Sequence, residues 1–595
     1  MNIQTSVGEI AVTGEFGTAW KLEHTKTELE PGLELVHLHL ETEGELPPPQ
    51  FSLHWFIPLV DIQTRWAPMV NYNRYLPPNW SCETKSNLAS SAPIMAFLNQ
   101  KGQNRFTMAI SEAIREVKIY GGVHEERCDV ECRAELFTAP EAPLHSYDVT
   151  LRFDTRGIFY ADAIRAVSDW FAAMPAYKPS PAPAAAFEPI YSSWYSYHQE
   201  VFDKELEAEC ALAKEFGMKG IIVDDGWQYC YGEWDANSWF PSGMEHLAKE
   251  LTKMGFEPGL WFAPAIAEPH SRIAQLDYDM LAGSVGGQPC LAYECMRRVG
   301  FILDPTVRKT EKFLEDTFRR YADMGYKYFK LDFLCSMFNA PRFSDPNIKR
   351  DELIPRLLAP VWRGINGRSV LLGCNYPYTA GNSMVEAVRI GADIHARWDN
   401  LTHNLPAVAS HFWANKKLWL NDPDFALCRS AETSNDPDLN RLNPMWPFVT
   451  PDQTYNPERN FEQATMNRSE LEILLSLVLA AAGAVNLSDK MTLLNEQGLF
   501  LARKVVSAES GEAARPLDLF SAARPARFLQ KLKSGWRVLL VNWGETAEQV
   551  SFDLAAHGVR AASATDFWAE KPVSISSGRL EFELAPHSCK LIELN

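Results

Sequence analysis

The spacing of hydrophobic residues divides the chain into three regions. In the first, residues 1 to about 155, apolar and polar side chains alternate over short runs such as LELVHLHLE and VTLRFD. Alternation with a period of two predicts half-buried β-strands, and many such strands in succession predict a β-sandwich. A helical pattern over 159–174 follows, and the Pro- and Ala-rich segment 176–189 is typical of a linker.

The middle region, residues 190–508, alternates short apolar runs with amphipathic helical patterns. Eight runs are strand candidates: PIYSSWYS, GIIVDDGW, GLWFAP, YFKLDFL, SVLLGCN, AVRIGAD, KLWLNDPD and GAVNLSD. Eight βα units predict a (β/α)8 TIM barrel, which takes about 250 residues or more. An open doubly wound sheet is the alternative, and it would usually carry a Gly-rich phosphate turn that this sequence lacks.

The last region, residues 509–595, returns to short alternating runs without a long helical pattern. It predicts a small antiparallel β domain. The predicted fold is therefore multidomain, α/β and β. A β-sandwich with a trailing helix spans 1–175, a linker 176–189, the central barrel 190–508 and the C-terminal β domain 509–595.

Charge narrows the class of partner. With 57 Lys and Arg against 76 Asp and Glu, the chain has a formal net charge of −19, which opposes nucleic acid or an anionic membrane as a partner. A neutral carbohydrate fits better, and the 18 Trp and 32 Phe include rings on which a sugar could stack, although most are expected in the core. The longest apolar run, LLSLVLAAAGAV, is too short to span a membrane.

The cysteines and the N-terminal residues indicate the cellular compartment in which the protein is expected. Eleven Cys without any CxxC pair indicate neither a disulfide framework nor a zinc site. The N-terminal residues MNIQTSVGEIAVTG lack the basic and apolar segments of a signal peptide. We therefore expect reduced thiols and cytoplasmic residence.

Polar residues end most of the predicted barrel strands, where TIM barrels place their active sites. In the fourth run, Lys330 and Asp332 fall on one face and apolar neighbours on the other. The apolar face has to meet the outer helices, so the two polar side chains are expected in the barrel mouth. The same alternation in the sixth run places Arg389 and Asp393 there.

Two carboxyl groups flanking one sugar ring are what glycoside hydrolysis requires, and Asp332 and Asp393 meet this requirement. Lys330 is expected to keep Asp332 ionised, and Arg389 to donate a hydrogen bond to a sugar hydroxyl near the reacting carbon. A carboxylate cluster that holds Mg²⁺ is an alternative that spacing alone leaves open.

A lone aspartate at a strand end is more often a helix cap or a salt-bridge partner than a catalytic group. Asp422 and Asp424, around a predicted turn at Pro423, are interpreted as loop-fixing residues, and so is Asp489.

At the paired carboxylates the sequence resembles glycoside hydrolase clan D, the α-galactosidases and α-N-acetylgalactosaminidases that include families 27 and 36. KLD at 330–332 is similar to the clan's K-x-D nucleophile motif, and RIGADIHARW at 389–398 to its acid/base motif R-x-x-x-D-x-x-x-x-W. IIVDDGWQ at 221–228 resembles the signature whose Asp pair grips the 4- and 6-hydroxyls of galactose, which implies this role for Asp224 and Asp225.

Further segments extend the resemblance. WLNDPDF at 419–425 is similar to the N-D-P-D segment of family 27, and WFPSGMEHLAKELTKMGFEPGLWF at 239–262 to family 36. The predicted domain order is also that of family 36. Trp194 and Trp261 lie where such enzymes place aromatic rings in the sugar pocket, and Trp398, the last residue of the acid/base motif, is a third candidate.

The resemblance implies a retaining, exo-acting hydrolase of terminal α-galactosyl-type residues. Asp332 would be the nucleophile and Asp393 the acid/base, with carboxyl groups about 5–5.5 Å apart. Asp393 would need a raised pKa to donate its proton. The resemblance implies no cofactor and no metal, a carbohydrate as partner, and a homo-oligomer as a common state of family 36.

Two departures from the family pattern leave the substrate open. The usual G-L-W-x-E-P-E of family 36 reads GLWFAPA at 259–265, so both acids are lost. The Gly-rich C-x-x-G-x-x-R loop that faces the sugar 2-position is replaced by CNYPY at 374–378, where Cys374 and Asn375 are the binding candidates. An α-N-acetylgalactosaminidase, another α-glycosidase of the clan, a raffinose-synthase-like transglycosylase and a non-catalytic sugar-binding protein remain alternatives.

Overall fold

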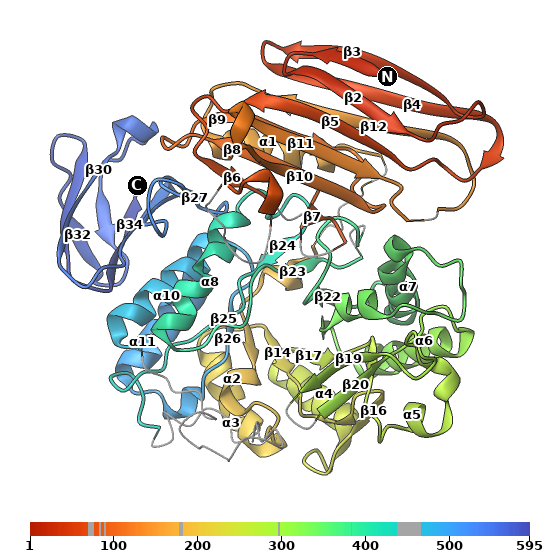
Figure 1. Ribbon diagram of the computed structural model, residues 1–595. Helices are drawn as coiled ribbons and strands as arrows, with labels where there is room; N and C mark the ends of the chain where they lie inside the picture. Colours follow the sequence, from red (N-terminus) through yellow and green to blue (C-terminus); the bar gives the residue numbers. More distant parts are fainter. Residues whose placement is uncertain are drawn as a thin grey trace, which may run out of the picture.

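Strands dominate both ends of the chain, and strands paired with helices make up its middle (Figure 1). The computed structural model describes residues 1–68, 76–81, 85–88, 91–139, 141–175, 177, 182–295, 298–381, 384–436 and 466–595. Two N-terminal sheets, a central parallel barrel and a C-terminal β domain confirm the predicted fold class. Residue 176 and residues 178–181 of the predicted linker lie outside the described residues.

The N-terminal body consists of two antiparallel sheets packed face to face. One has the order β1 (Asn2–Thr5), β2 (Gly8–Gly14), β5 (Phe51–Pro58), β11 (Asp129–Leu136), β10 (Val117–His124), β7 (Lys85–Ser86). The other has the order β3 (Lys21–Glu30), β4 (Leu33–Leu46), β12 (Leu144–Asp154), β9 (Asn104–Ile110), β8 (Ile94–Leu98), β6 (Thr64–Trp66).

Alternate residues of these strands form the sandwich core, as the period of two predicts. Phe51, Leu53, Trp55 and Ile57 of β5 are all buried. The ring of Trp55 lies 5.4 Å, between centroids, from that of Phe153 in the opposite sheet. Helix α1 (Tyr160–Ala172) follows the last strand.

The barrel is a parallel sheet that closes on itself. Its order is β24 (Leu420–Asp422), β23 (Ala387–Arg389), β22 (Val370–Gly373), β21 (Tyr328–Leu331), β17 (Glu257–Phe262), β14 (Gly220–Val223), β13 (Ile190–Ser192), β26 (Asn486–Leu487), β25 (Phe425–Ala426). Only Pro423 and Asp424 separate β24 from β25, so the two ends of this order meet. Each of the eight predicted runs overlaps one strand, and the seventh supplies β24 and leads directly into β25.

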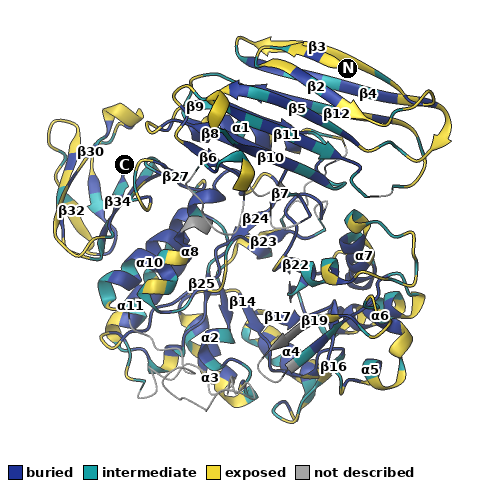
Figure 2. Ribbon diagram, viewed as in Figure 1, coloured by how far each residue is buried: buried dark blue, intermediate teal, exposed yellow. Residues whose placement is uncertain are grey.

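Amphipathic helices cover the barrel, and Figure 2 shows its strands buried beneath them. They are α3 (Asp203–Glu215), α4 (Gly243–Met254), α6 (Arg308–Met324), α7 (Leu353–Ile365), α8 (Trp398–Ser410), α10 (Arg468–Ala481) and α11 (Glu496–Ser507). Helix α6 buries Leu314, Phe318 and Tyr321, an i, i+4, i+7 stripe, and ends at Gly325 with φ 106°. Among the described residues no helix has both the length and the apolar character needed to cross a membrane.

Short elements after the strands build the mouth of the barrel. They are α2 (Trp194–Tyr197), the hairpin of β15 (Gln228–Cys230) and β16 (Glu233–Ala236), a small sheet of β18 (Ile266–Ala267), β20 (Arg298–Ile302) and β19 (Leu291–Cys295), and α5 (Arg272–Leu276). These loops carry the polar residues considered below.

The C-terminal body is antiparallel throughout. A six-stranded sheet has the order β27 (Arg515–Pro516), β28 (Arg527–Lys531), β29 (Trp536–Asn542), β34 (Ser588–Leu594), β31 (Ala564–Asp566), β32 (Lys571–Val573), and β30 (Glu548–Asp553) pairs with β33 (Arg579–Leu584).

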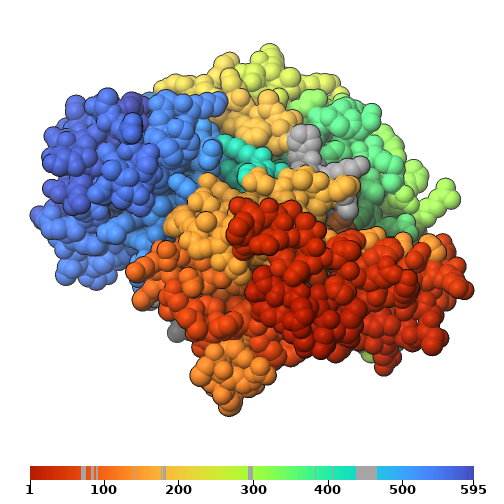
Figure 3. Space-filling model, turned by 90° about the horizontal axis from the view of Figure 1, so that it is seen from above, coloured from red at the N-terminus to blue at the C-terminus, as the bar shows by residue number. Residues whose placement is uncertain are grey.

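One hydrophobic cluster reaches into all three bodies, in addition to the separate cores of the sandwich and the C-terminal domain. The largest buried cluster includes Trp66 of the sandwich, Trp413 of the barrel region and Phe528 of the C-terminal domain. Seen from above, the red and orange N-terminal residues lie directly against the barrel, and the blue C-terminal residues flank it (Figure 3). The bodies are therefore held together by apolar packing.

Glu386 lies buried beneath the barrel and provides a test of this core. Its side chain accepts a hydrogen bond from the Leu371 amide at 2.8 Å, and burial raises its pKa from 4.5 to about 7. The folded state therefore binds a proton that the unfolded chain releases, so stability is highest below about pH 4.5 and is lost as pH rises through about 7.

Glu386→Gln keeps an acceptor for the amide and removes the titration. Between about pH 5 and about pH 8 we expect the wild-type unfolding free energy to fall by about 2–3 kcal/mol more than that of the variant, measured by denaturant titration. The exposed Glu257→Gln is the matched control. Equal pH slopes for wild type and Glu386→Gln would contradict the assignment.

Candidate active site

The proposed nucleophile, Asp332, directly follows β21 at the carboxyl end of the barrel. Its amide donates to the Phe262 carbonyl at 2.8 Å and so continues the strand ladder by one residue. One carboxylate oxygen accepts from the Phe333 amide at 2.7 Å and the other from the Trp261 indole N–H at 3.3 Å. Two donors from different strands thus fix the carboxylate in the mouth.

Strained backbone marks the same end of the barrel. Phe333, Asn375 and Asp424 each lie two residues past a barrel strand, and their φ angles are 56°, 52° and 80°. A left-handed conformation at a residue other than glycine costs about 1–3 kcal/mol and persists where the surrounding structure enforces it, as it often does at active sites.

Lys330 lies in the mouth as predicted, but its partner differs from the expected one. Its ammonium pairs with Asp224 at 2.9 Å, and both side chains are buried. Burial lowers the pKa of Lys330, but Asp224 together with the other acidic groups around it holds the pKa above its usual value.

Lys330 favours the ionised form of Asp332, as expected, but burial has the larger effect on the pKa of Asp332. Burial raises the pKa of Asp332, Lys330 opposes this only in part, and the charge of Asp393 raises the pKa further. Both residues follow barrel strands at the carboxyl end of the sheet, Asp332 directly after β21 and Asp393 four residues after β23 ends.

Asp393 follows β23 and lies at the open side of the site, with 63% of its side chain exposed. Arg389 donates to it at 2.6 Å and, through its other terminal nitrogen, pairs with Asp424 at 2.8 Å. Desolvation works to raise the pKa of Asp393, but the Arg389 guanidinium holds the pKa below its usual value. The expectation of a raised pKa for Asp393 is therefore wrong for this structure. The reason is that Arg389 binds the Asp393 carboxylate, whereas we expected Arg389 to bind a sugar hydroxyl.

Asp424 has a larger part in the site than the sequence indicated. Its carboxylate accepts from the Ile394 amide at 2.7 Å, directly after the proposed acid/base, and also holds Arg389. Asn404 donates to the Asp393 carbonyl at 2.8 Å. Asp424 therefore does fix a loop, and that loop is the one that carries Asp393.

The Asp pair after β14 is almost completely enclosed. Asp224 accepts from Ser192 at 3.1 Å and from Lys330. Asp225 accepts from Gln228 at 2.5 Å, from the Tyr231 hydroxyl at 2.6 Å and from Gln199.

Gly226 makes the contact with Gln199 possible. Its φ is 125°, and a Cβ there would lie 2.5 Å from the Gln199 backbone. Sequence reasoning missed Gln199, Gln228 and Tyr231, because nothing in their local pattern shows that they converge on one carboxylate.

Trp261 and Trp194 are two of the three aromatic candidates. Trp261 is buried with its N–H on Asp332, and its ring lies 5.2 Å from that of Tyr231. Trp194 begins α2, where its ring contacts that of His198 at 5.0 Å. Burial lowers the pKa of His198 to about 3, so this ring is neutral.

The loop after β22 carries the two candidates for the sugar 2-position. Cys374 is buried in the barrel interior, in electrostatic contact with Asp332, and burial raises the pKa of its thiol. Asn375 is exposed, and its carbonyl accepts from the Cys335 amide at 2.8 Å. Tyr376 and Tyr378, which replace the family's glycine-rich loop, are buried.

Trp398 does not join the other candidates. Its ring stacks on His587 of the C-terminal domain, with centroids 4.2 Å apart, and lies 5.5 Å from Trp543. Its prediction as a sugar-binding residue is therefore corrected to a role in packing between domains.

We expect Trp398→Ala to lower the unfolding free energy by about 2 kcal/mol and to change KM for an aryl α-galactoside by less than about twofold. Thermal unfolding and steady-state kinetics measure the two effects. A large rise in KM with unchanged stability would restore the sugar-binding role.

A closed barrel with two carboxylates after the carboxyl ends of its strands is an arrangement typical of glycoside hydrolases. Residues 186–341 match the Melibiase family, and residues 527–594 match the family described as the alpha galactosidase C-terminal beta sandwich domain. These matches confirm the predicted relationship to the family 36-like α-galactosidases, and the chain carries both domains of such proteins.

One curated relative shares a short stretch of sequence with this chain, and solved structures share its fold. The α-galactosidase AgaA of Geobacillus stearothermophilus is 25% identical over 92 residues, which are 14% of this chain and 13% of that enzyme. A structure of AgaA in complex with raffinose has a TM-score of 0.64 at 12% identity and covers 99% of this chain and 83% of that one. TtGalA, an α-galactosidase from Thermus thermophilus in complex with stachyose, has a TM-score of 0.58 at 18% identity and covers 86% and 99%.

Proposed function

We propose that this protein hydrolyses terminal α-galactosyl residues with retention of configuration. The observation that carries the proposal is the placement of two aspartates at the carboxyl end of the barrel, with Asp332 after β21 and Asp393 after β23, two strands that both neighbour β22. The matched Melibiase domain and the galactosides bound to the structural relatives support galactose as the sugar.

In the proposed first step, Asp332 attacks the anomeric carbon and Asp393 protonates the departing oxygen. A covalent glycosyl-enzyme results, and Asp393 then takes a proton from the water that releases the sugar. Because Arg389 holds Asp393 ionised in the free protein, substrate binding has to weaken this ion pair so that Asp393 takes up a proton from solvent, which it then donates to the leaving oxygen.

A panel of nitrophenyl α-glycosides of galactose, N-acetylgalactosamine and glucose tests the sugar. We expect kcat/KM to be highest for galactose, and equal or higher values for another sugar would overturn that part of the proposal. Proton NMR of the first product distinguishes the mechanism, since retention gives the α-anomer initially. Product analysis with an added acceptor sugar separates hydrolysis from transglycosylation.

The proposed compartment is the cytoplasm. Cys210, Cys428 and Cys589 are buried free thiols. Thiols that stay reduced support a reducing compartment.

A further inference from the structure

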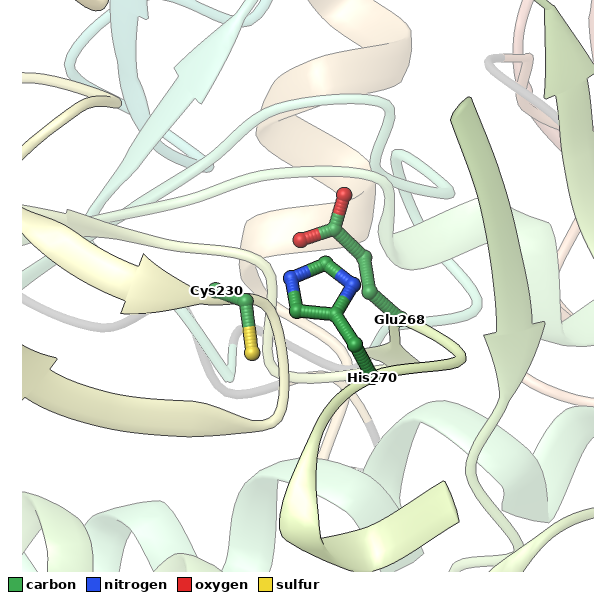
Figure 4. A group of neighbouring side chains, drawn as sticks. All are labelled: Cys230, Glu268 and His270. Atoms are coloured by element: carbon green, nitrogen blue, oxygen red, sulfur yellow. The ribbon is translucent and has the colours of Figure 1, made fainter. Parts of the chain in front are cut away.

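Two loops at the barrel mouth bring three side chains with metal-binding groups together. Cys230 ends β15, and Glu268 and His270 follow β18 (Figure 4). Their ligand atoms, the thiol sulfur, a carboxylate oxygen and an imidazole nitrogen, all lie within 4.8 Å of one another. Cys230 and Glu268 are buried, and His270 is exposed.

The protein backbone holds these loops in register. The Glu268 amide donates to the Tyr231 carbonyl at 2.9 Å, and the Tyr231 amide donates to the Glu268 carboxylate at 3.0 Å. Gly232 allows the close approach, because its φ is 85° and a Cβ there would lie 2.9 Å from the Ala267 side chain. The positions of Cys230 and Glu268 are therefore set by the fold.

The donor set selects the class of ion. A thiolate, an imidazole and a carboxylate together suit Zn²⁺, whereas Mg²⁺ and Ca²⁺ prefer oxygen ligands alone. Zinc bonds of about 2.0–2.3 Å place tetrahedral ligand atoms about 3.5 Å apart. The exposed His270 can close the remaining distance by side-chain rotation, and water can complete the tetrahedron.

We propose that Cys230, Glu268 and His270 form a zinc site on the rim of the barrel mouth. The cysteine pattern of the sequence indicated no zinc site, because the cysteine and the histidine come from separate βα loops without a spacing motif. The site is distinct from the proposed catalytic pair, and zinc takes no part in the chemical step.

The site is linked to a predicted sugar-binding residue. The Tyr231 amide donates a hydrogen bond to the Glu268 carboxylate, and the Tyr231 hydroxyl donates one to Asp225 at 2.6 Å. An ion on Glu268 would therefore restrain Tyr231 and through it Asp225. This consequence rests on the proposed function, and it predicts that zinc lowers KM for the galactoside by about fivefold and leaves kcat nearly unchanged.

Cobalt substitution tests the site without any assay of activity. Untagged full-length protein, freed of metal with a chelator, is titrated with Co²⁺ and then with Zn²⁺. We expect one equivalent of Co²⁺ to give a thiolate-to-cobalt charge-transfer band in the near ultraviolet, which zinc then removes. Because the thiol must lose its proton, the affinity should rise with pH.

Variants test whether the proposed ligands bind the Co²⁺ that gives the charge-transfer band. Cys230→Ser should lose the charge-transfer band, and His270→Ala, at an exposed position that leaves folding intact, should weaken Co²⁺ binding at least about tenfold. Cys128→Ser, at an exposed thiol in the N-terminal sandwich, is the matched control and should bind as wild type does. Absence of the band in wild type, or unchanged binding by His270→Ala, overturns the proposal.

Kinetics with and without zinc test the coupling separately. Zinc should lower KM in wild type and leave KM unchanged in His270→Ala. Asp332→Asn, which we expect to be inactive, should still show the wild-type cobalt spectrum. A failed activity proposal would therefore leave the metal site intact, and a failed metal proposal would leave the hydrolase intact.

Discussion

Asp332→Asn is expected to lower kcat on an aryl α-galactoside by about 10⁴-fold, which corresponds to about 5.5 kcal/mol in the activation free energy. An amide cannot supply the electron pair that forms the glycosyl-enzyme. Its carbonyl oxygen can still accept from the Phe333 amide or the Trp261 indole, which now hold the carboxylate, so the fold should persist.

Asp393→Ala is the informative comparison for this loss. A nitrophenolate leaves without protonation, so this variant should still form the glycosyl-enzyme from an aryl galactoside and lose activity on galactosides with an alkyl leaving group. Circular dichroism and galactose binding check that both variants fold. If Asp332→Asn keeps kcat within about tenfold of wild type, Asp332 is not the nucleophile.

Lys330→Met is expected to lower the unfolding free energy by about 3–5 kcal/mol, because it leaves Asp224 buried without its cation. The side chains of Lys330 and Asp224 are 7% and 2% exposed, so water cannot replace the lost partner. The variant should also lose activity, since Lys330 is one of the cations that lower the pKa of Asp332.

A double variant separates the ion pair from simple packing. Lys330→Met combined with Asp224→Asn removes the uncompensated charge and should recover part of the lost stability in denaturant unfolding. Lys417→Met, at an exposed lysine that pairs with Asp169, should cost less than about 1 kcal/mol. If the single and double variants at the buried pair are equally unstable, the cost comes from packing and not from the charge.

The directions of the pKa shifts of Asp332 and Asp393 differ from those that we expected from their proposed roles. In the free protein the proposed nucleophile has the raised pKa and the proposed acid/base the lowered one. Burial is the largest cause of the raised pKa of Asp332, and the pairing of Arg389 with Asp393 lowers the pKa of Asp393. The proposed mechanism therefore requires the substrate to change the environment of Asp393.

The sequence by itself determined the three-part architecture and the inward direction of Lys330, Asp332 and Arg389. These features follow from local periodicity, because alternation within a strand decides which side chains face the barrel interior. The motifs that resemble clan D likewise lie within single βα units and could be read from consecutive residues.

Only the tertiary structure decided which side chains from separate parts of the chain come into contact. Asp225 with Gln199, Asp424 with Arg389, Trp398 with His587, and Cys230 with His270 are contacts between different loops or domains. Their distances depend on how the barrel closes and how the C-terminal domain packs, and a local pattern contains no information on either. Because pKa values depend on these contacts and on burial, the protonation states of Asp332 and Asp393 were decided at the same level.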